Sequence, residues 1–79
     1  MKIPRNLTGR KLAHLLSSYG YVITRQTGSH IRLTTEQKGI HHITIPDHNP
    51  LRIGTLSSIL NDVAQHFDFS KKELVNRLF

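Results

Sequence analysis

The chain has 79 residues, a net charge of +6 with histidine neutral, and no cysteine. This length suits one small domain that buries about 60% of its unfolded surface, so we expect residues 1–79 to form a single domain. Without cysteine there are no disulfides or thiolate metal sites, and no stretch approaches the ~20 apolar residues of a membrane helix; we therefore expect a cytoplasmic protein.

The excess positive charge lies in the first 35 residues. They contain no acidic residue and six basic ones: Lys2, Arg5, Arg10, Lys11, Arg25 and Arg32. In the remainder of the chain five basic residues balance five acidic ones. A one-sided basic surface attracts phosphate groups, which makes nucleic acid the favoured partner. An acidic protein partner or a solubilising role is the alternative, and a membrane is disfavoured because the first predicted helix lacks a bulky aromatic face.

An amphipathic helix is predicted over residues 8–19. Its apolar side chains recur at i, i+3, i+4 and i+7, at Leu12, Leu15, Leu16 and Tyr19. The opposite side carries Arg10, Lys11, His14 and Ser18. Thr8 is suited to cap the start of this helix, and Gly20 is suited to end it.

Three strands are predicted next. Residues 21–26 and 29–35 should form a hairpin around a turn at Thr27 and Gly28, and residues 40–45 a third strand that ends at Pro46. Alternation assigns two sets of side chains to opposite faces. One face receives Ile31, Leu33, Ile43 and Ile45, and the other receives His30, Arg32, His42 and Thr44.

The last third of the chain is predicted to be helical. After a loop at 47–52, an apolar stripe at helical spacing comprises Leu56, Ile59, Leu60, Val63, Ala64 and Phe67. Following a break near Asp68, Ser70 and Glu73 form a capping box for a short final helix. The order αβββαα predicts an α+β fold, with a three-stranded antiparallel sheet, helices packed on one face and the other face open to a ligand.

Two motifs resemble the HicA family of toxin–antitoxin ribonucleases. They are R-Q-T-G-S-H at 25–30 and I-P-D-H-N-P-L-R-I-G-T-L at 45–56, and the similarity extends over nearly the whole chain. The resemblance implies a fold like that of double-stranded-RNA-binding domains, metal-independent mRNA cleavage without a cofactor, and inhibition by a HicB-like antitoxin. It also implies that His30, in the G-S-H turn, is the catalytic histidine. Residues 35–41 and 61–69 look longer than in the shorter family members.

The chemistry of His30 agrees with that implication. RNA cleaves itself when its 2′-hydroxyl is deprotonated to attack the adjacent phosphate, and an imidazole suits either proton transfer near pH 7. Arg25 and Arg32 are predicted to stabilise charge on the phosphate, while Gly28 and Ser29 let the backbone approach it. From its strand position alone, His30 would more often be an exposed histidine without function.

Further basic residues are candidates for binding the RNA backbone. Arg10 and Lys11 lie on the predicted outer face of the first helix, and Arg52 precedes the start of the long helix, where free N–H groups favour an anion. Their ordinary interpretation is that they are solvated charges. A non-catalytic RNA-binding module and a protein that binds only an acidic partner remain the alternative functions.

The remaining histidines do not indicate a metal site. His41 and His42 are neighbours on a predicted strand, so their side chains should point to opposite faces and cannot readily share one ion. His48 has only Asp47 as a nearby acid. His14 and His66 lie on predicted helices beside polar residues, where we expect them to face solvent.

Overall fold

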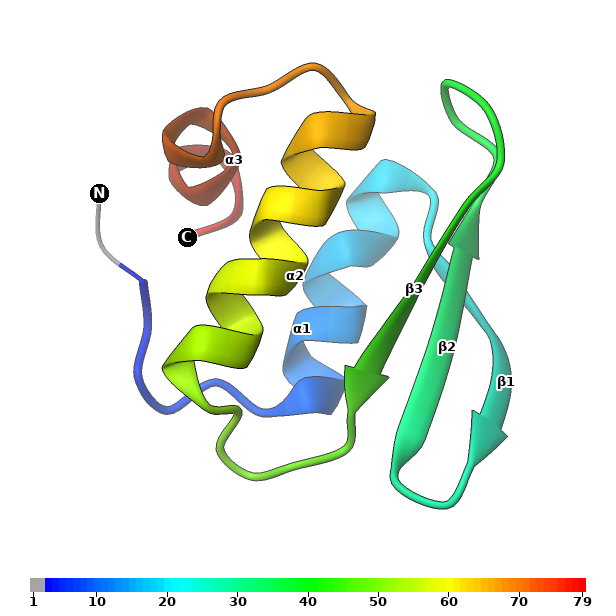
Figure 1. Cartoon of the computed structure of the whole chain (residues 1–79), viewed down its shortest axis with the longest axis vertical. Coiled ribbons are helices and arrows are strands. Elements are labelled where there is room, and N and C mark those ends of the chain that lie inside the picture. Colours follow the sequence, from blue (N-terminus) through cyan, green and yellow to red (C-terminus); the bar gives the residue numbers. More distant parts are fainter. Residues whose placement is uncertain (1–2) are drawn as a thin grey trace.

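The computed structural model describes residues 3–79, and Lys2 of the basic segment lies outside them (Figure 1). The elements are α1 (Gly9–Leu16), a short 3₁₀ turn η1 (Ser17–Tyr19), β1 (Val22–Thr27), β2 (His30–Thr35), β3 (His41–Pro46), α2 (Ile53–His66) and α3 (Lys71–Leu78). This order confirms the predicted α+β fold with its αβββαα arrangement. None of the helices in residues 3–79 has the length and hydropathy needed to cross a membrane.

The first helix begins as predicted but its last turn is tighter. The Thr8 hydroxyl accepts a hydrogen bond from the backbone N–H of Lys11 at 3.0 Å, which makes Thr8 the N-cap. The hydroxyls of Ser17 and Ser18 bond back to carbonyls one turn earlier, and from Ser17 the chain continues as η1. Gly20 then ends the segment with a φ of 81°, a conformation that glycine adopts without strain.

The sheet is an antiparallel meander in the order β1-β2-β3. The β1–β2 turn comprises Gly28, with a φ of 57°, and Ser29, one residue later than the sequence predicted. A β-bulge interrupts β1 at Thr24, between the pairs Ile23↔Leu33 and Arg25↔Arg32. Alternation alone did not reveal this extra residue.

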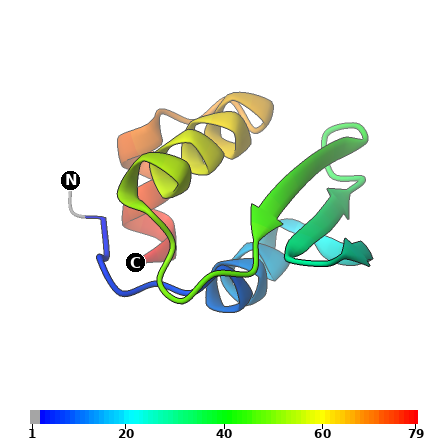
Figure 2. The same ribbon diagram turned by 60° about the horizontal axis from the view of Figure 1, so that its bottom comes forward.

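One face of the sheet is covered and the other is open. Ile31, Leu33, Ile43 and Ile45 are buried, whereas His30, Arg32, His42 and Thr44 are exposed, as predicted. Both α1 and α2 lie on the buried side, and no described helix covers the opposite face (Figures 1 and 2). The open face is therefore the surface of the sheet available to a ligand.

The final helix packs on the same core. The Ser70 hydroxyl accepts a hydrogen bond from the Glu73 N–H at 3.0 Å, which confirms the predicted start of α3. Before it, Asp68 adopts a φ of 59°, and this residue lies in the predicted break. Leu74 and Val75 are buried with the apolar side chains of α2, so α3 closes the side of the core that lies farthest from the sheet (Figure 1).

Candidate functional site

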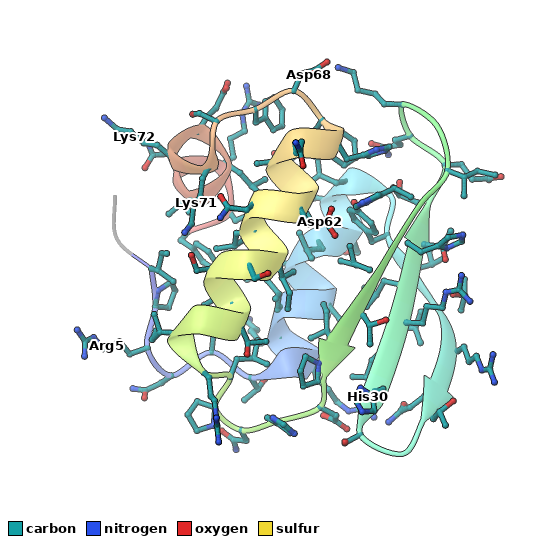
Figure 3. All side chains as sticks on the ribbon, in the orientation of Figure 1. Arg5, His30, Asp62, Asp68, Lys71 and Lys72 are labelled. Atoms are coloured by element: carbon teal, nitrogen blue, oxygen red, sulfur yellow. The ribbon has the colours of Figure 1, made fainter. Side chains whose placement is uncertain are left out.

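His30 is the first residue of β2 and lies on the open face. It is exposed, and its cross-strand neighbours are Thr27 of β1 and Pro46 of β3. Figure 3 shows it at the hairpin end of the sheet. The Asp47 N–H donates to the Ser29 carbonyl at 2.7 Å, which ties the turn before His30 to the loop after β3. The His30 side chain is therefore accessible to a substrate, and a hydrogen bond holds the backbone just before it in place. A proton-transfer group needs both access and a defined position.

Two arginines face each other beside His30. Arg25 and Arg32 are directly opposite on β1 and β2, and both are exposed. Because paired residues share a face, Arg25 lies on the open face with Arg32. Ile23 pairs with Leu33 and so belongs to the covered face, and strict alternation from Ile23 would have placed Arg25 on that face too. The bulge at Thr24 therefore places both arginine side chains on the open face.

This arginine pair lacks acidic partners. Neither guanidinium forms an ion pair within residues 3–79. Like charges directly opposite on a sheet destabilise it, and an anion between them would remove that cost. Arg32 is two residues from His30, or about 7 Å along the strand. Such an arrangement can hold a phosphate group within reach of the imidazole.

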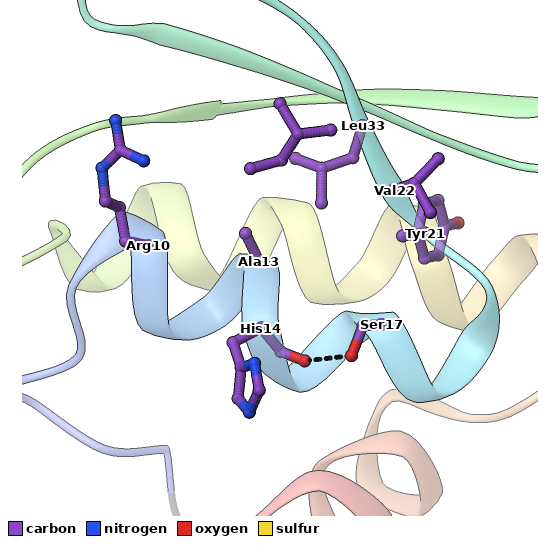
Figure 4. A pocket seen from close by; sticks show the side chains of 8 residues that line it. Arg10, Ala13, His14, Ser17, Tyr21, Val22 and Leu33 are labelled. Atoms are coloured by element: carbon purple, nitrogen blue, oxygen red, sulfur yellow. Dashed lines mark hydrogen bonds between the residues drawn. The ribbon is translucent and has the colours of Figure 1, made fainter.

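Arg10 has a different environment from the one expected. Its side chain projects from α1 toward the sheet (Figure 4), beside an apolar hollow of about 370 Å³ between α1 and β1. The guanidinium lies 3.2 Å from the Asp47 carboxylate and donates to the Gln26 side chain at 3.1 Å. Arg10 thus joins α1, β1 and the loop after β3, instead of extending outward from the helix.

The other predicted contacts lie on separate elements. Lys11 is exposed on α1, which is on the covered side of the sheet and away from His30. Arg52 precedes α2 and lines a hollow of about 620 Å³ that begins at Pro46, the cross-strand neighbour of His30. The structure therefore groups Arg25, Gly28, Ser29 and Arg32 with His30, brings Arg52 near the same end of the sheet, and separates Lys11 from them.

A polar cluster that extends from buried Tyr21 to exposed Asp62 on the covered side was not predicted. The hydroxyl of Tyr21 lies 2.6 Å from Nδ1 of His41, whose Nε2 is 3.1 Å from the Asp62 carboxylate. Burial, with a smaller effect of Asp62, raises the pKa of the Tyr21 phenol well above 10.0, so the phenol stays protonated and donates to His41. Figure 3 shows Asp62 on α2, facing the sheet. The three side chains connect the start of the sheet to α2.

The prediction that His14 and His66 face solvent is confirmed for His14 and only partly correct for His66, which is half-buried. Its ring stacks on His41 at a centroid distance of 4.4 Å, and its Nε2 is 2.9 Å from the Gln37 carbonyl. The prediction for His41 and His42 is confirmed, because His41 points to the covered side and His42 lies exposed on the open face. Among the described residues, no group of three or more His, Asp or Glu side chains is arranged to hold a metal ion.

Comparison with known proteins identifies the family. The sequence model of the HicA toxin of bacterial toxin–antitoxin systems matches residues 9–64, from the start of α1 into the last turns of α2. Neither the curated proteins nor the solved structures include a significant match to the chain. The matched segment contains the whole sheet, the G-S-H turn and the arginine pair. The chain therefore belongs to the HicA toxin family of bacterial toxin–antitoxin systems.

Proposed function

We propose that this HicA-family protein is an endoribonuclease that cleaves mRNA, with His30 as its catalytic residue. The observation that carries the proposal is the arginine pair next to His30 on the open face. Two unpaired guanidinium groups attract phosphate, and the adjacent imidazole can transfer a proton to or from a bound sugar–phosphate backbone. Cleavage at a 2′-hydroxyl requires charge stabilisation and two proton transfers, of which these groups supply the first and one of the transfers.

The proposed reaction proceeds by attack of the RNA on itself. The 2′-oxygen loses its proton and forms a new bond to phosphorus, while the bond from phosphorus to the 5′-oxygen breaks and that oxygen takes up a proton. His30 performs one of these two proton transfers. Arg25 and Arg32 stabilise the negative charge that develops on the phosphate oxygens. Gly28 and Ser29 have small side chains, so the turn leaves room for the phosphate to approach His30.

We assign supporting roles to the more distant basic residues. Arg52 binds the RNA backbone beyond the cleaved bond, and Arg10 contributes positive potential while it holds the loop at Asp47. Lys11, on the covered side, contacts only RNA that extends past the edge of the sheet to α1. A HicB-like antitoxin would silence the enzyme by covering the open face. Because His30 is exposed on the surface, a protein partner can bury it without a conformational change.

Replacement of His30 tests the proposal directly. His30→Ala should lower the rate of cleavage of a labelled mRNA by at least about 10²-fold, because proton-transfer groups contribute about 10²–10⁴-fold. The fold should persist, since the side chain is exposed. His14→Ala is the matched control, because His14 is exposed on α1. EDTA should not change the wild-type rate, as the proposed reaction uses no metal ion. If His30→Ala cleaves at the wild-type rate, the assignment is wrong.

The alternative is a non-catalytic RNA-binding module that uses the same arginine pair. It predicts that wild-type protein binds RNA, that added salt weakens this binding, and that no cleavage product forms. Binding without product in the wild type would therefore favour the module over the ribonuclease.

A further inference from the structure

A third hollow occupies the end of the open face farthest from His30. Its volume is about 490 Å³, and it is centred on the cross-strand row Val22↔Thr34↔His42. Thr34 is four residues from His30 along β2, which corresponds to about 13 Å. The arginine pair lies between them, so the face presents His30, the guanidinium groups and the hollow in succession.

The rim of this hollow is apolar and exposed. Val22 is 60% exposed and Ile40 is 68% exposed, the two highest values among the large exposed hydrophobic side chains described. They flank the hollow from β1 and from the residue before β3. Apolar side chains so exposed on a basic surface favour a ligand with a flat apolar face.

The lining of the hollow also includes polar side chains. The hydroxyls of Thr24 and Thr34 are 3.0 Å apart, and the Thr34 hydroxyl lies 2.8 Å from Nδ1 of His42. The bulge places Thr24 in this chain of hydrogen bonds. Glu36 also lines the hollow and has no cationic partner in the described part of the chain. An anion is disfavoured next to this carboxylate, so the hollow is not a second phosphate site.

We propose that the hollow binds one unpaired nucleobase of the RNA strand whose backbone lies on Arg25 and Arg32. The proposal rests on the function proposed above, which supplies that strand. A base offers a flat face for Ile40 and His42 and a hydrogen-bonding edge for the threonine hydroxyls. A purely apolar peptide side chain would offer no hydrogen-bond donor to the Glu36 carboxylate and would displace water from it, which is unfavourable.

Glu36 further determines which bases fit. A carboxylate accepts a hydrogen bond from an exocyclic amino group, and adenine, cytosine and guanine each carry one. Uracil carries none, and its one donor on that edge, N3–H, lies between two carbonyl oxygens that repel the carboxylate. The hollow therefore selects against uridine at one position of the substrate, at a fixed distance from the cleaved phosphate.

The test measures binding without cleavage. Fluorescently labelled 2′-O-methyl oligonucleotides cannot undergo attack by the 2′-oxygen, and an abasic site is moved through them one position at a time. At one position the abasic site should weaken binding to the wild type at least about fivefold. Ile40→Ser should weaken binding of the intact oligonucleotide by a similar factor and remove the effect of the abasic site. Glu36→Gln should reduce discrimination against uridine at that position.

The control variant is Phe79→Ser, which removes an exposed apolar side chain at the C-terminal end of the chain, far from the sheet (Figure 1). It should bind each oligonucleotide as the wild type does. If an abasic site weakens binding at no position while unmodified RNA is still cleaved, the proposal of a nucleobase site is wrong and the proposed ribonuclease activity stands. If an abasic site weakens binding at one position but unmodified RNA is not cleaved, the nucleobase site is supported and the ribonuclease activity is not. If Ile40→Ser weakens only antitoxin binding, the hollow belongs to a protein interface and the inference is overturned.

Discussion

At the scale of single residues, the arginine pair on the open face connects stability with binding. Arg32→Gln removes one of two like charges that face each other, so the free energy of unfolding should stay constant or rise by about 0.2–1 kcal/mol. RNA affinity should fall, and the slope of log K against log salt should decrease by about 0.7, as expected for one lost contact with single-stranded phosphate. Urea unfolding and titrations at several salt concentrations measure the two effects.

The control for this prediction is Lys72→Gln, which removes an exposed charge from α3. That variant should leave the salt slope unchanged. A marked loss of stability in Arg32→Gln would show instead that the guanidinium has a structural role.

Gly9 is a second residue whose environment makes a sharp prediction. A Cβ atom at Gly9 would lie 2.0 Å from the Pro46 carbonyl oxygen, and the Gly9 N–H donates to the His48 carbonyl at 3.0 Å. Gly9→Ala should therefore destabilise the protein by about 1–3 kcal/mol, although alanine is the better helix former. Thermal unfolding measures the change. Gly54→Ala is the matched control, because its Cβ meets no atom within 4 Å; it should be neutral or stabilising by up to about 1 kcal/mol.

At the scale of elements, the cluster of Tyr21, His41 and Asp62 links β3 and α2 to the residue before β1. Tyr21 is only 1% exposed, and burial raises its folded-state pKa above the ordinary value of 10.0. The folded protein then holds the phenolic proton more tightly than the unfolded chain. Its contribution to stability is complete below pH 10.0 and decreases as the pH rises beyond that value.

Tyr21→Phe should therefore change two measurable quantities. The free energy of unfolding at neutral pH should fall by about 1 kcal/mol, because His41 loses its hydrogen-bond donor. The decrease in stability at alkaline pH should also become shallower than in the wild type. Urea unfolding between pH 7 and pH 11 measures both, with Tyr19→Phe as the control, since Tyr19 is outside the cluster. An unchanged alkaline slope in Tyr21→Phe would contradict the assignment.

At the scale of the whole molecule, α3 tests whether the chain behaves as one domain. Leu74 is fully buried, although α3 lies beyond the segment that matches the family model. Leu74→Ala should lower the free energy of unfolding by about 2–5 kcal/mol, a large share of a total on the order of 5–10 kcal/mol. The transition should shift to lower temperature as a single step, measured by calorimetry. Two separate transitions would mean that α3 unfolds independently of the sheet.

Most of the fold could be predicted because periodicity is a local property. The alternation of Ile31 and Leu33 with His30 and Arg32 was enough to assign both faces of β2, and the apolar spacing in α2 was enough to assign its buried side. Thr8 and Ser70 act as caps through bonds to residues three positions later. The candidate site rested on motif similarity, and the family match supports the family assignment without testing the residue roles.

Tertiary structure decided where side chains from different elements meet. The sequence determined the order of the elements, the faces of the strands and the position of His30 after its turn, because these depend on neighbours in the chain. The bulge that turns Arg25 toward Arg32, the contact of Arg10 with Asp47 and the stacking of His66 on His41 depend on strand register and on how α1 and α2 pack on the sheet. Such contacts join residues far apart in the chain, so no local pattern encodes them.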